Sequence, residues 1–145
     1  MKGSLIYKKD NNMKNLFITI LLLLSTFGYS QEVLTDDNFE DAVKGRSAFQ
    51  DDNVKVVVVE FWASFNDANS FKGWDSLKGI RYYKVDISKS PKAKKEYKVR
   101  TIPHIILFLD GYDETHFKAG LDFAIKESLE EIQEAIDDLN NQSKF

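Results

Sequence analysis

The sequence predicts an α/β fold in which a central mixed β-sheet carries helices on both of its faces. Strand-like and helical patterns alternate through most of the chain after residue 30, as they do in parallel βαβ units. The segment Val54–Trp62 is almost continuously apolar and β-branched, which is typical of a central strand covered on both faces. Two strands joined by a short turn and a closing amphipathic helix follow, so antiparallel pairing is expected beside the parallel pairs.

Five segments have the apolar alternation or the apolar run of β-strands. In chain order they are Glu32–Leu34, Val54–Trp62, Ile80–Ile87, His104–Leu109 and Glu114–Ala119. The last two are separated by Asp110-Gly111, a pair that favours a tight hairpin turn. These two strands are therefore expected to be antiparallel neighbours.

Helices are expected where capping residues precede apolar residues at helical spacing. The expected helices cover about 36–46, 66–77, a stretch that starts at Pro91, and about 125–139. Thr35, Asn66 and Ser90 are the expected N-caps, and Pro91 suits the first position of its helix. In the last helix apolar residues recur every four and three positions, and its other face is acidic.

The first 30 residues have the pattern of a secretory signal peptide. Lys14 precedes the apolar run Leu16–Leu24, and the small residues Gly28 and Ser30 predict cleavage between Ser30 and Gln31. The apolar stretch is shorter than the roughly 20 residues that span a bilayer, so no stable membrane anchor is expected after cleavage. The protein is therefore expected to be exported, either to the periplasm or out of the cell.

This pattern divides the chain into three parts. They are an N-terminal extension and signal peptide over 1–30, a folded domain over 31–140 whose mature start lies near Gln31, and a C-terminal tail over 141–145. Met13-Lys14 also resembles a natural start, so whether residues 1–12 are translated stays open.

The composition excludes several classes of function. The 145 residues contain no cysteine, which excludes disulfides, thiolate nucleophiles and cysteine-held metal clusters. The formal net charge is −3, and without the four lysines and one aspartate of residues 1–30 it becomes −6. An acidic domain is a poor nucleic-acid binder. No motif predicts a cofactor or a metal, and a protein or peptide is the expected partner.

The residues in these segments resemble the thioredoxin family. Glu60-Phe61-Trp62-Ala63 and Thr101-Ile102-Pro103 stand at the separation found in that family, and similar residues run from Leu34 to Gly111. The resemblance covers nearly all of the chain after residue 30. It implies a thioredoxin fold in which the Ile102–Pro103 peptide bond, just before the β-hairpin, is cis.

The resemblance also shows what this chain lacks. Thioredoxins carry two redox cysteines at the positions that here are Asn66 and Asn69. An amide has no thiolate form, so thiol–disulfide exchange is excluded. The buried aspartate that handles protons for those cysteines corresponds to Glu60, and the threonine after the proline corresponds to His104. The helix expected from Asn66 is shorter than its thioredoxin counterpart by roughly two turns.

Each candidate site residue has a structural and a functional interpretation. Asn66 either caps a helix or, together with Asn69, hydrogen-bonds the backbone of a bound peptide. Pro103 either fixes a turn or helps backbone groups to capture an extended segment. The expected peptide-binding groove consists of Trp62, Phe65, Asn66, Thr101, Ile102 and Pro103.

Two further groups have side chains that can take part in chemical reactions. Glu60 is expected to be a buried carboxylate, either a relic or one bonded to lysine or water. His104 and His116 are expected on neighbouring strands of the hairpin, close enough to approach each other. No ligand-spacing motif supports a metal site of these two histidines with one carboxylate, and none is predicted.

These observations favour a binding module: an exported thioredoxin-fold protein without thiol–disulfide redox activity. It would hold an extended segment of a partner protein in the cis-proline groove, in a chaperone-like or assembly role. Two alternatives stay open. One is a structural subunit with Trp62, Phe65 and Trp74 in a permanent interface, although the sequence does not give the oligomeric state. The other is an enzyme that uses Glu60 or His104 in non-thiol chemistry, for which no nucleophile–base pair is visible.

Overall fold

The computed structural model describes residues 3, 31–45 and 54–143, and the fold below belongs to the unit Gln31–Phe145. The predicted signal peptide over 1–30 lies outside the described residues except for Gly3, and so do residues 144–145 of the predicted tail. Within the described ranges, no helix is long and apolar enough to cross a membrane.

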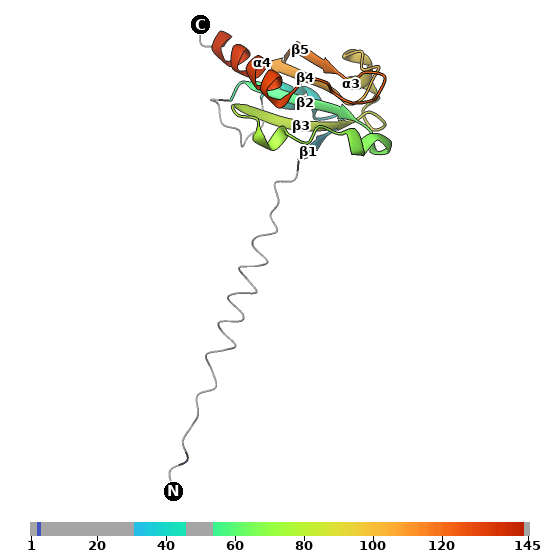
Figure 1. Ribbon diagram of the computed structural model, residues 1–145, viewed down its shortest axis with the longest axis horizontal. Coiled ribbons are helices and arrows are strands. Elements are labelled where there is room, and N and C mark those ends of the chain that lie inside the picture. The colour runs from blue at the N-terminus through green and yellow to red at the C-terminus, as the bar shows by residue number, and fades with distance from the viewer. Residues whose placement is uncertain (1–2, 4–30, 46–53, 144–145) are drawn as a thin grey trace. The chain divides into compact units, whose positions relative to one another are not determined.

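The described strands form one mixed sheet in the order β1-β3-β2-β4-β5 (Figure 1). They are β1 (Glu32–Leu34), β2 (Val56–Trp62), β3 (Ile80–Asp86), β4 (His104–Leu109) and β5 (Tyr112–Lys118). β3 pairs in parallel with β1 and β2, whereas β4 is antiparallel to both β2 and β5. The predicted mixed sheet is confirmed, and no predicted strand end is displaced by more than two residues.

The hairpin between β4 and β5 is as tight as predicted. Leu109 pairs with Tyr112, which leaves Asp110 and Gly111 as a two-residue turn. Both turn residues have positive φ, 52° at Asp110 and 88° at Gly111. A type I′ turn requires this conformation, and Asp-Gly adopts it readily.

The strands build two apolar cores, one on each face of the sheet. The helices that cover them are α2 (Phe39–Val43), α3 (Pro91–Glu96) and α4 (Leu129–Gln142). Val57 and Phe61 of β2 lie in the first core, with residues of α2 and α3, whereas Val56 and Val58 lie in the second, with residues of α4. In Figure 1, α4 crosses the near face of the sheet. Burial on both faces accounts for the unbroken apolar run in β2.

The segment between β2 and β3 differs from the prediction. The sequence predicts an α-helix over 66–77, but the structure has two short 3-10 turns, η1 (Ser64–Asn69) and η2 (Trp74–Ser76). Asn66 is not an N-cap, because it lies inside η1, which begins two residues earlier. The shortening that the sequence indicates in this region therefore removes the α-helix altogether.

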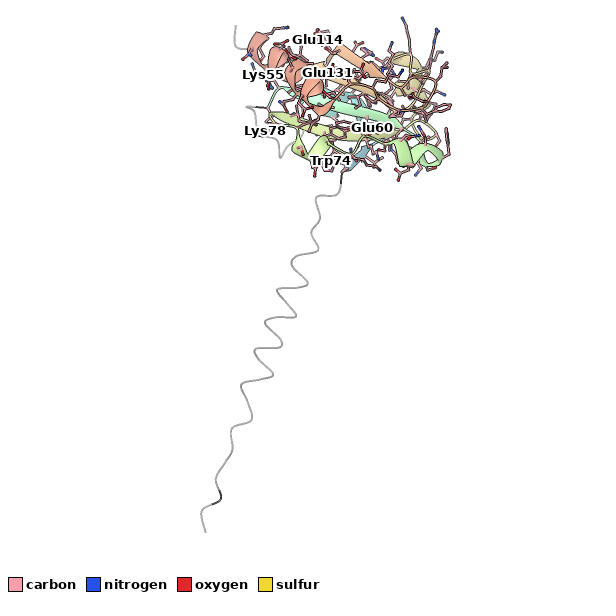
Figure 2. The ribbon with its side chains drawn as sticks, viewed as in Figure 1. Lys55, Glu60, Trp74, Lys78, Glu114 and Glu131 are labelled. Carbon is pink, nitrogen blue, oxygen red and sulfur yellow. The ribbon has the colours of Figure 1, made fainter. Side chains whose placement is uncertain are left out.

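Aromatic side chains cover the part of the sheet that this missing helix leaves. Phe71 and Trp74 both pack on Tyr82 of β3, with ring centroids 6.4 Å and 5.5 Å away. Phe71 and Tyr82 also pack against the second core, in which Leu77 is buried. Figure 2 shows Trp74 below Glu60 of β2 in this view. Trp74 therefore packs over the sheet at β3 in this region.

α2 is shorter than the helix predicted over 36–46. It begins at Phe39, because the preceding residues form a turn in which the Asn38 side chain accepts the Thr35 N–H at 2.7 Å. The helix also ends earlier than predicted, at Val43, two residues before Gly45, whose φ is 69°. Thr35 therefore belongs to the turn and does not cap the helix directly.

α3 begins at Pro91 as predicted, but a different side chain caps it. Ser90 stands at the N-cap position, and its hydroxyl makes no capping hydrogen bond. The Asp36 carboxylate, in the turn before α2, takes that role by accepting the N–H groups of Lys92 at 3.0 Å and Ala93 at 2.9 Å. An acidic residue is favourable here because a helix N-terminus carries partial positive charge.

α4 begins at Leu129, four residues after the predicted start at 125. Ser128 and Glu131 form a capping box, which fixes the first turn. The Ser128 hydroxyl accepts the Glu131 N–H at 3.2 Å, and the Glu131 carboxylate accepts the Ser128 N–H at 2.7 Å. Ile125 precedes the helix and still packs against the second core.

Candidate functional site

The structure brings the Asn66 side chain to a cis-proline. Asn66 Nδ2 donates a hydrogen bond to the Ile102 carbonyl oxygen at 3.0 Å, and the Ile102–Pro103 peptide bond is cis. η1 follows the end of β2, and the proline precedes β4. Because β2 and β4 are antiparallel neighbours, these two segments meet at the same end of the sheet.

The two asparagines that replace the family's cysteines are bonded to each other. Asn69 Nδ2 donates to Asn66 Oδ1 at 2.8 Å. Asn66 therefore uses its amide group toward Ile102 and its carbonyl group toward Asn69. The prediction that the Asn66 side chain caps a helix is wrong, because η1 has no side-chain cap and its N-cap position is Ala63.

A third segment, the loop between β5 and α4, reaches the same place. The Phe123 carbonyl oxygen lies 3.4 Å from Asn66 Nδ2, and the Ala119 N–H donates to the Pro103 carbonyl oxygen at 3.0 Å. This loop was not predicted from the sequence as part of the site. Its only signal is a pair of large apolar residues, Leu121 and Phe123, in a stretch with neither strand nor helix spacing.

Large apolar side chains are exposed on the two segments, η1 and the β5–α4 loop, that meet at this contact. We call them the apolar rim: Phe65, Leu121 and Phe123, with exposed fractions of 81%, 101% and 53%. Phe65 precedes Asn66 in η1, and the other two lie in the β5–α4 loop. The rim therefore joins a residue that the sequence analysis selected to two that it missed.

The other residues of the predicted groove are less exposed to solvent than residues that contact a ligand directly. Ile102 and Pro103 are buried, and Thr101 is half-buried. Trp62 is half-buried beneath the Lys84 ammonium, which lies 4.4 Å from the centroid of the indole ring. These four residues form the floor under the contact, and the apolar rim supplies the exposed surface.

Glu60 is fully buried, as predicted, but its hydrogen bonds come from partners that the sequence analysis did not name. One carboxylate oxygen accepts the Ser70 hydroxyl at 2.8 Å and the Phe71 N–H at 2.9 Å, and the other accepts the Tyr82 hydroxyl at 3.0 Å. Burial and the Glu60 carboxylate raise the pKa of Tyr82, so the phenol keeps its proton. No lysine takes part in these hydrogen bonds, and the carboxylate joins the segment after η1 to β2 and β3.

The two histidines meet across the hairpin. His104 Nε2 lies 3.0 Å from His116 Nδ1, and His116 Nε2 lies 3.1 Å from Asp113 Oδ2. His104 is completely buried. Burial, with smaller contributions from His116 and Lys118, lowers the pKa of His104 to about 4. Among the described residues, no group of three histidine, aspartate or glutamate side chains is arranged to hold a metal ion.

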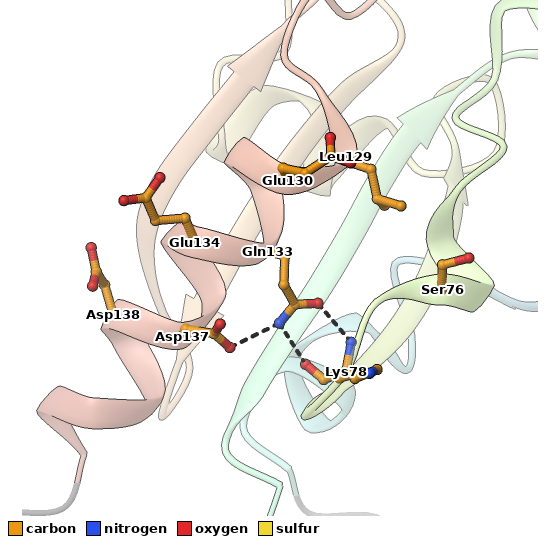
Figure 3. A pocket seen from close by; sticks show the side chains of 8 residues that line it. All are labelled: Ser76, Lys78, Leu129, Glu130, Gln133, Glu134, Asp137 and Asp138. Carbon is orange, nitrogen blue, oxygen red and sulfur yellow. Dashed lines mark hydrogen bonds between the residues drawn. The ribbon is translucent and has the colours of Figure 1, made fainter.

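A separate pocket of about 570 Å³ lies between α4 and the residues before β3 (Figure 3). Gln133 spans it by accepting the Lys78 N–H at 2.8 Å and donating to the Lys78 carbonyl at 3.3 Å. Exposed carboxylates of the acidic helix face line the rest: Glu130, Glu134, Asp137 and Asp138. None of the predicted site residues lines this pocket.

The fold and the cis-proline at the end of the central strands define a thioredoxin-like protein. The model of the thioredoxin family matches residues 30–131, so the chain belongs to the thioredoxin family. A curated relative, Thioredoxin-2 of Pyricularia oryzae, is 34% identical over 80 residues. That match covers 51% of this chain and 42% of the relative, so the chain spans less than half of its length.

Solved structures show the same fold at low identity. A designed protein has a TM-score of 0.56 at 16% identity, and the match covers 76% of this chain and 97% of the designed chain. A chain from a study of thiol resolution in yeast mitochondrial 1-Cys peroxiredoxin, via glutathione/thioredoxin systems, has a TM-score of 0.53 at 20% identity. That match covers 76% of this chain and 96% of the other chain. These likenesses support the fold alone.

The site in this family member has no group for the family's redox chemistry. Disulfide exchange requires a thiolate, and the chain contains no cysteine. The cis-proline end of the sheet instead presents amide groups, backbone carbonyls and exposed apolar side chains. Such groups donate and accept hydrogen bonds and bury apolar surface, and both properties serve binding.

Proposed function

We propose that this protein is an exported, redox-inactive thioredoxin-fold module that binds an extended segment of a partner protein beside the cis-proline. The observation that carries the proposal is the apolar rim, which flanks the hydrogen-bonded contact of Asn66 with Ile102. Export rests on the signal-peptide pattern of residues 1–30. A chaperone-like or assembly role fits a module that holds a segment without reacting with it.

The apolar rim supplies the driving force for binding. Phe65 and Leu121 are almost fully exposed, and burying such a side chain is worth about 1.5–3 kcal/mol. Contiguous exposed apolar side chains on a folded domain mark interaction surfaces. A partner segment that covers the three rim residues gains this free energy, and its own side chains must therefore be apolar where they meet the rim.

Polar groups beside the rim supply the orientation. Asn69 is exposed, and only one of its polar groups is engaged by Asn66. The Ile102 carbonyl accepts one hydrogen bond from Asn66 and has a second lone pair. An extended backbone has donors and acceptors that match such groups. The bound segment is held by reversible contacts only, because no mixed disulfide can form.

A binding titration with matched aromatic substitutions tests the proposal. The probe is a permanently unfolded protein, reduced and alkylated and carrying a fluorophore, titrated with the chain that begins at Gln31. Phe65→Ser with Phe123→Ser removes most of the rim and should weaken binding by about 10-fold or more, which corresponds to about 1.4 kcal/mol. Tyr112→Ser is the control, since Tyr112 is 73% exposed on β5 and is not part of the rim.

Unchanged affinity in the double variant, or an equal loss in the Tyr112 control, would refute the proposal. Backbone amide shifts give a second measurement, and they should move at residues 65–69, 101–103 and 120–124 on addition of the probe. A stable oligomer in size-exclusion chromatography that the double variant dissociates would favour the alternative of a structural subunit. N-terminal sequencing of the exported protein tests export, with Gln31 as the expected first residue.

A further inference from the structure

A hydrogen-bonded chain of three titratable side chains runs from the surface of β5 into the first core. Asp113 is exposed, His116 is half-buried, and His104 is completely buried. The two contacts in the chain are 3.1 Å and 3.0 Å long. None of the three side chains belongs to the apolar rim or to the predicted groove, so the proposed function does not account for them.

The carboxylate at the outer end determines which ring nitrogens carry protons. Ionised Asp113 can only accept, so His116 Nε2 must carry the proton that it shares with Asp113. In a neutral ring the other nitrogen is an acceptor, and His116 Nδ1 therefore receives the proton of His104 Nε2. His104 Nδ1 is left as a bare acceptor, and it is buried without a hydrogen-bond partner among the described residues.

A further proton can bind to either histidine, with different results. On His116 Nδ1 it makes a cation that the Asp113 carboxylate balances, and the 3.0 Å contact persists when the His104 proton moves from Nε2 to Nδ1. On His104 it places a cation in the core with no acceptor beside it. The fold therefore resists a second proton on His104, whereas it tolerates one on His116.

Among the described residues, no carboxylate contacts His104 to compensate a charge on its ring. Lys118 of β5 stands opposite His104 in the ladder, and its charge opposes a second cation. On the β2 side, the Phe61 ring lies beside His104, and the two ring centroids are 6.3 Å apart. Tyr97, at the end of α3, packs on Phe61. Burial raises the pKa of Tyr97, with smaller contributions from the carboxylates of Glu96 on α3, Asp113 on β5 and Glu40 on α2.

We propose that the Asp113–His116–His104 chain is a proton-sensitive clamp that holds β5 against β4 at neutral pH and opens when the medium becomes acidic. β5 continues into Ala119, whose N–H holds the Pro103 carbonyl oxygen at 3.0 Å. The clamp therefore also secures the base of the loop that carries Leu121 and Phe123. Acidification weakens the fold first at this hairpin and at the loop that follows it.

The direction of the pH effect follows from where the proton binds. The pKa of His104 is lowered from 6.5 to about 4 in the fold, so the unfolded chain takes up this proton first as the pH falls. The stabilisation is complete above about pH 6.5 and is lost progressively toward pH 4. Between pH 8 and pH 5 this group alone should raise the unfolding equilibrium constant about 30-fold.

Urea unfolding of the full chain at pH 8 and pH 5 tests the clamp. In His104→Gln the side-chain amide can still donate to His116 but cannot titrate. Groups that do not contact residue 104 contribute equally to both proteins, so the ratio of unfolding constants at the two pH values should be larger in the unchanged protein than in the variant, by up to about 30-fold. Equal ratios in the two proteins would overturn the proposal.

Ring nitrogen NMR of the unchanged protein gives a measurement that needs no variant. At pH 7.5 both rings should be Nε2–H tautomers, and a scalar coupling should connect His104 Nε2 with His116 Nδ1. The coupling should persist in the folded protein down to about pH 4, because folded His104 takes up its second proton only there. A proton on His104 Nδ1 at pH 7.5, or titration of His104 near its ordinary pKa of 6.5 in the folded protein, would also overturn the clamp.

Discussion

At the scale of single residues, Glu60 shows how hydrogen bonds hold a carboxylate in an apolar core. Burying a charge costs several kcal/mol unless hydrogen bonds offset the loss of water. Three donors do so here, one each from Ser70, Phe71 and Tyr82. Two of these donors belong to the segment after η1, so the carboxylate holds that segment in place of the missing helix.

Substitution of Glu60 should separate hydrogen bonding from charge. Glu60→Gln keeps an oxygen for Ser70 and Phe71, and the Tyr82 hydroxyl can rotate to accept from the new amide, so the cost should be about 1 kcal/mol. Glu60→Ala leaves all three donors unpaired and opens a cavity, so the free energy of unfolding should fall by about 3–5 kcal/mol. Urea unfolding at pH 7 measures both, with Tyr82→Phe as the control for one lost bond. Equal stability of the Gln and Ala variants would contradict this role.

At the scale of elements, local patterns predicted the strands well because both the apolar run of β2 and the Asp110-Gly111 turn act through neighbouring residues. The errors lie where distant residues decide. Asp36 caps α3 across 56 positions of sequence, which no capping rule for adjacent residues can find. Asn66 looks like a helix cap, but a carbonyl 36 positions away takes its amide. The site was therefore predictable as a meeting of η1 and the cis-proline, whereas the contribution of the β5–α4 loop was not.

Restoring the two cysteines tests the placement of η1. The Asn66 and Asn69 side chains already reach each other at 2.8 Å, so Asn66→Cys with Asn69→Cys should form an internal disulfide under mild oxidant. Reductase activity should appear but remain weak, because Asp67 places a negative charge beside the first thiolate and η1 is a short 3-10 turn with little dipole. Thiol counting before and after oxidation measures the bridge. Each single variant should form none, and a folded double variant with two free thiols would show that the segment is placed differently.

At the scale of the whole molecule, the fold presents an acidic face on α4 and the apolar rim at the cis-proline end of the sheet. The family membership explains the sheet, the two cores and the cis-proline. It does not explain the rim, because Leu121 and Phe123 lie in a loop whose position depends on the hairpin and on the contacts of Ala119 and Asn66. The sequence could reveal the family through local motifs, but only the assembled sheet shows which loop meets the proline.

The predicted cleavage after Ser30 also has a consequence for stability. β1 begins at Glu32 and pairs with β3, so a chain that starts at Gln31 retains the whole described sheet. It should unfold in one cooperative transition, with the same free energy of unfolding as the full chain. A chain that starts at Thr35 loses β1 and the side chain of Leu34, which is 1% exposed in the first core.

The shorter chain should therefore be less stable by at least about 2–3 kcal/mol, the worth of one buried leucine side chain together with its strand pairing. Both truncated chains retain Asp36, so both keep the side chain that caps α3. Urea unfolding of the three chains, followed by far-ultraviolet circular dichroism, measures the differences. Equal stability of the Gln31 and Thr35 chains would show that β1 contributes nothing to the fold. A large loss already in the Gln31 chain would show that residues before Gln31 stabilise the domain, and cleavage after Ser30 would then be incompatible with a stable exported protein.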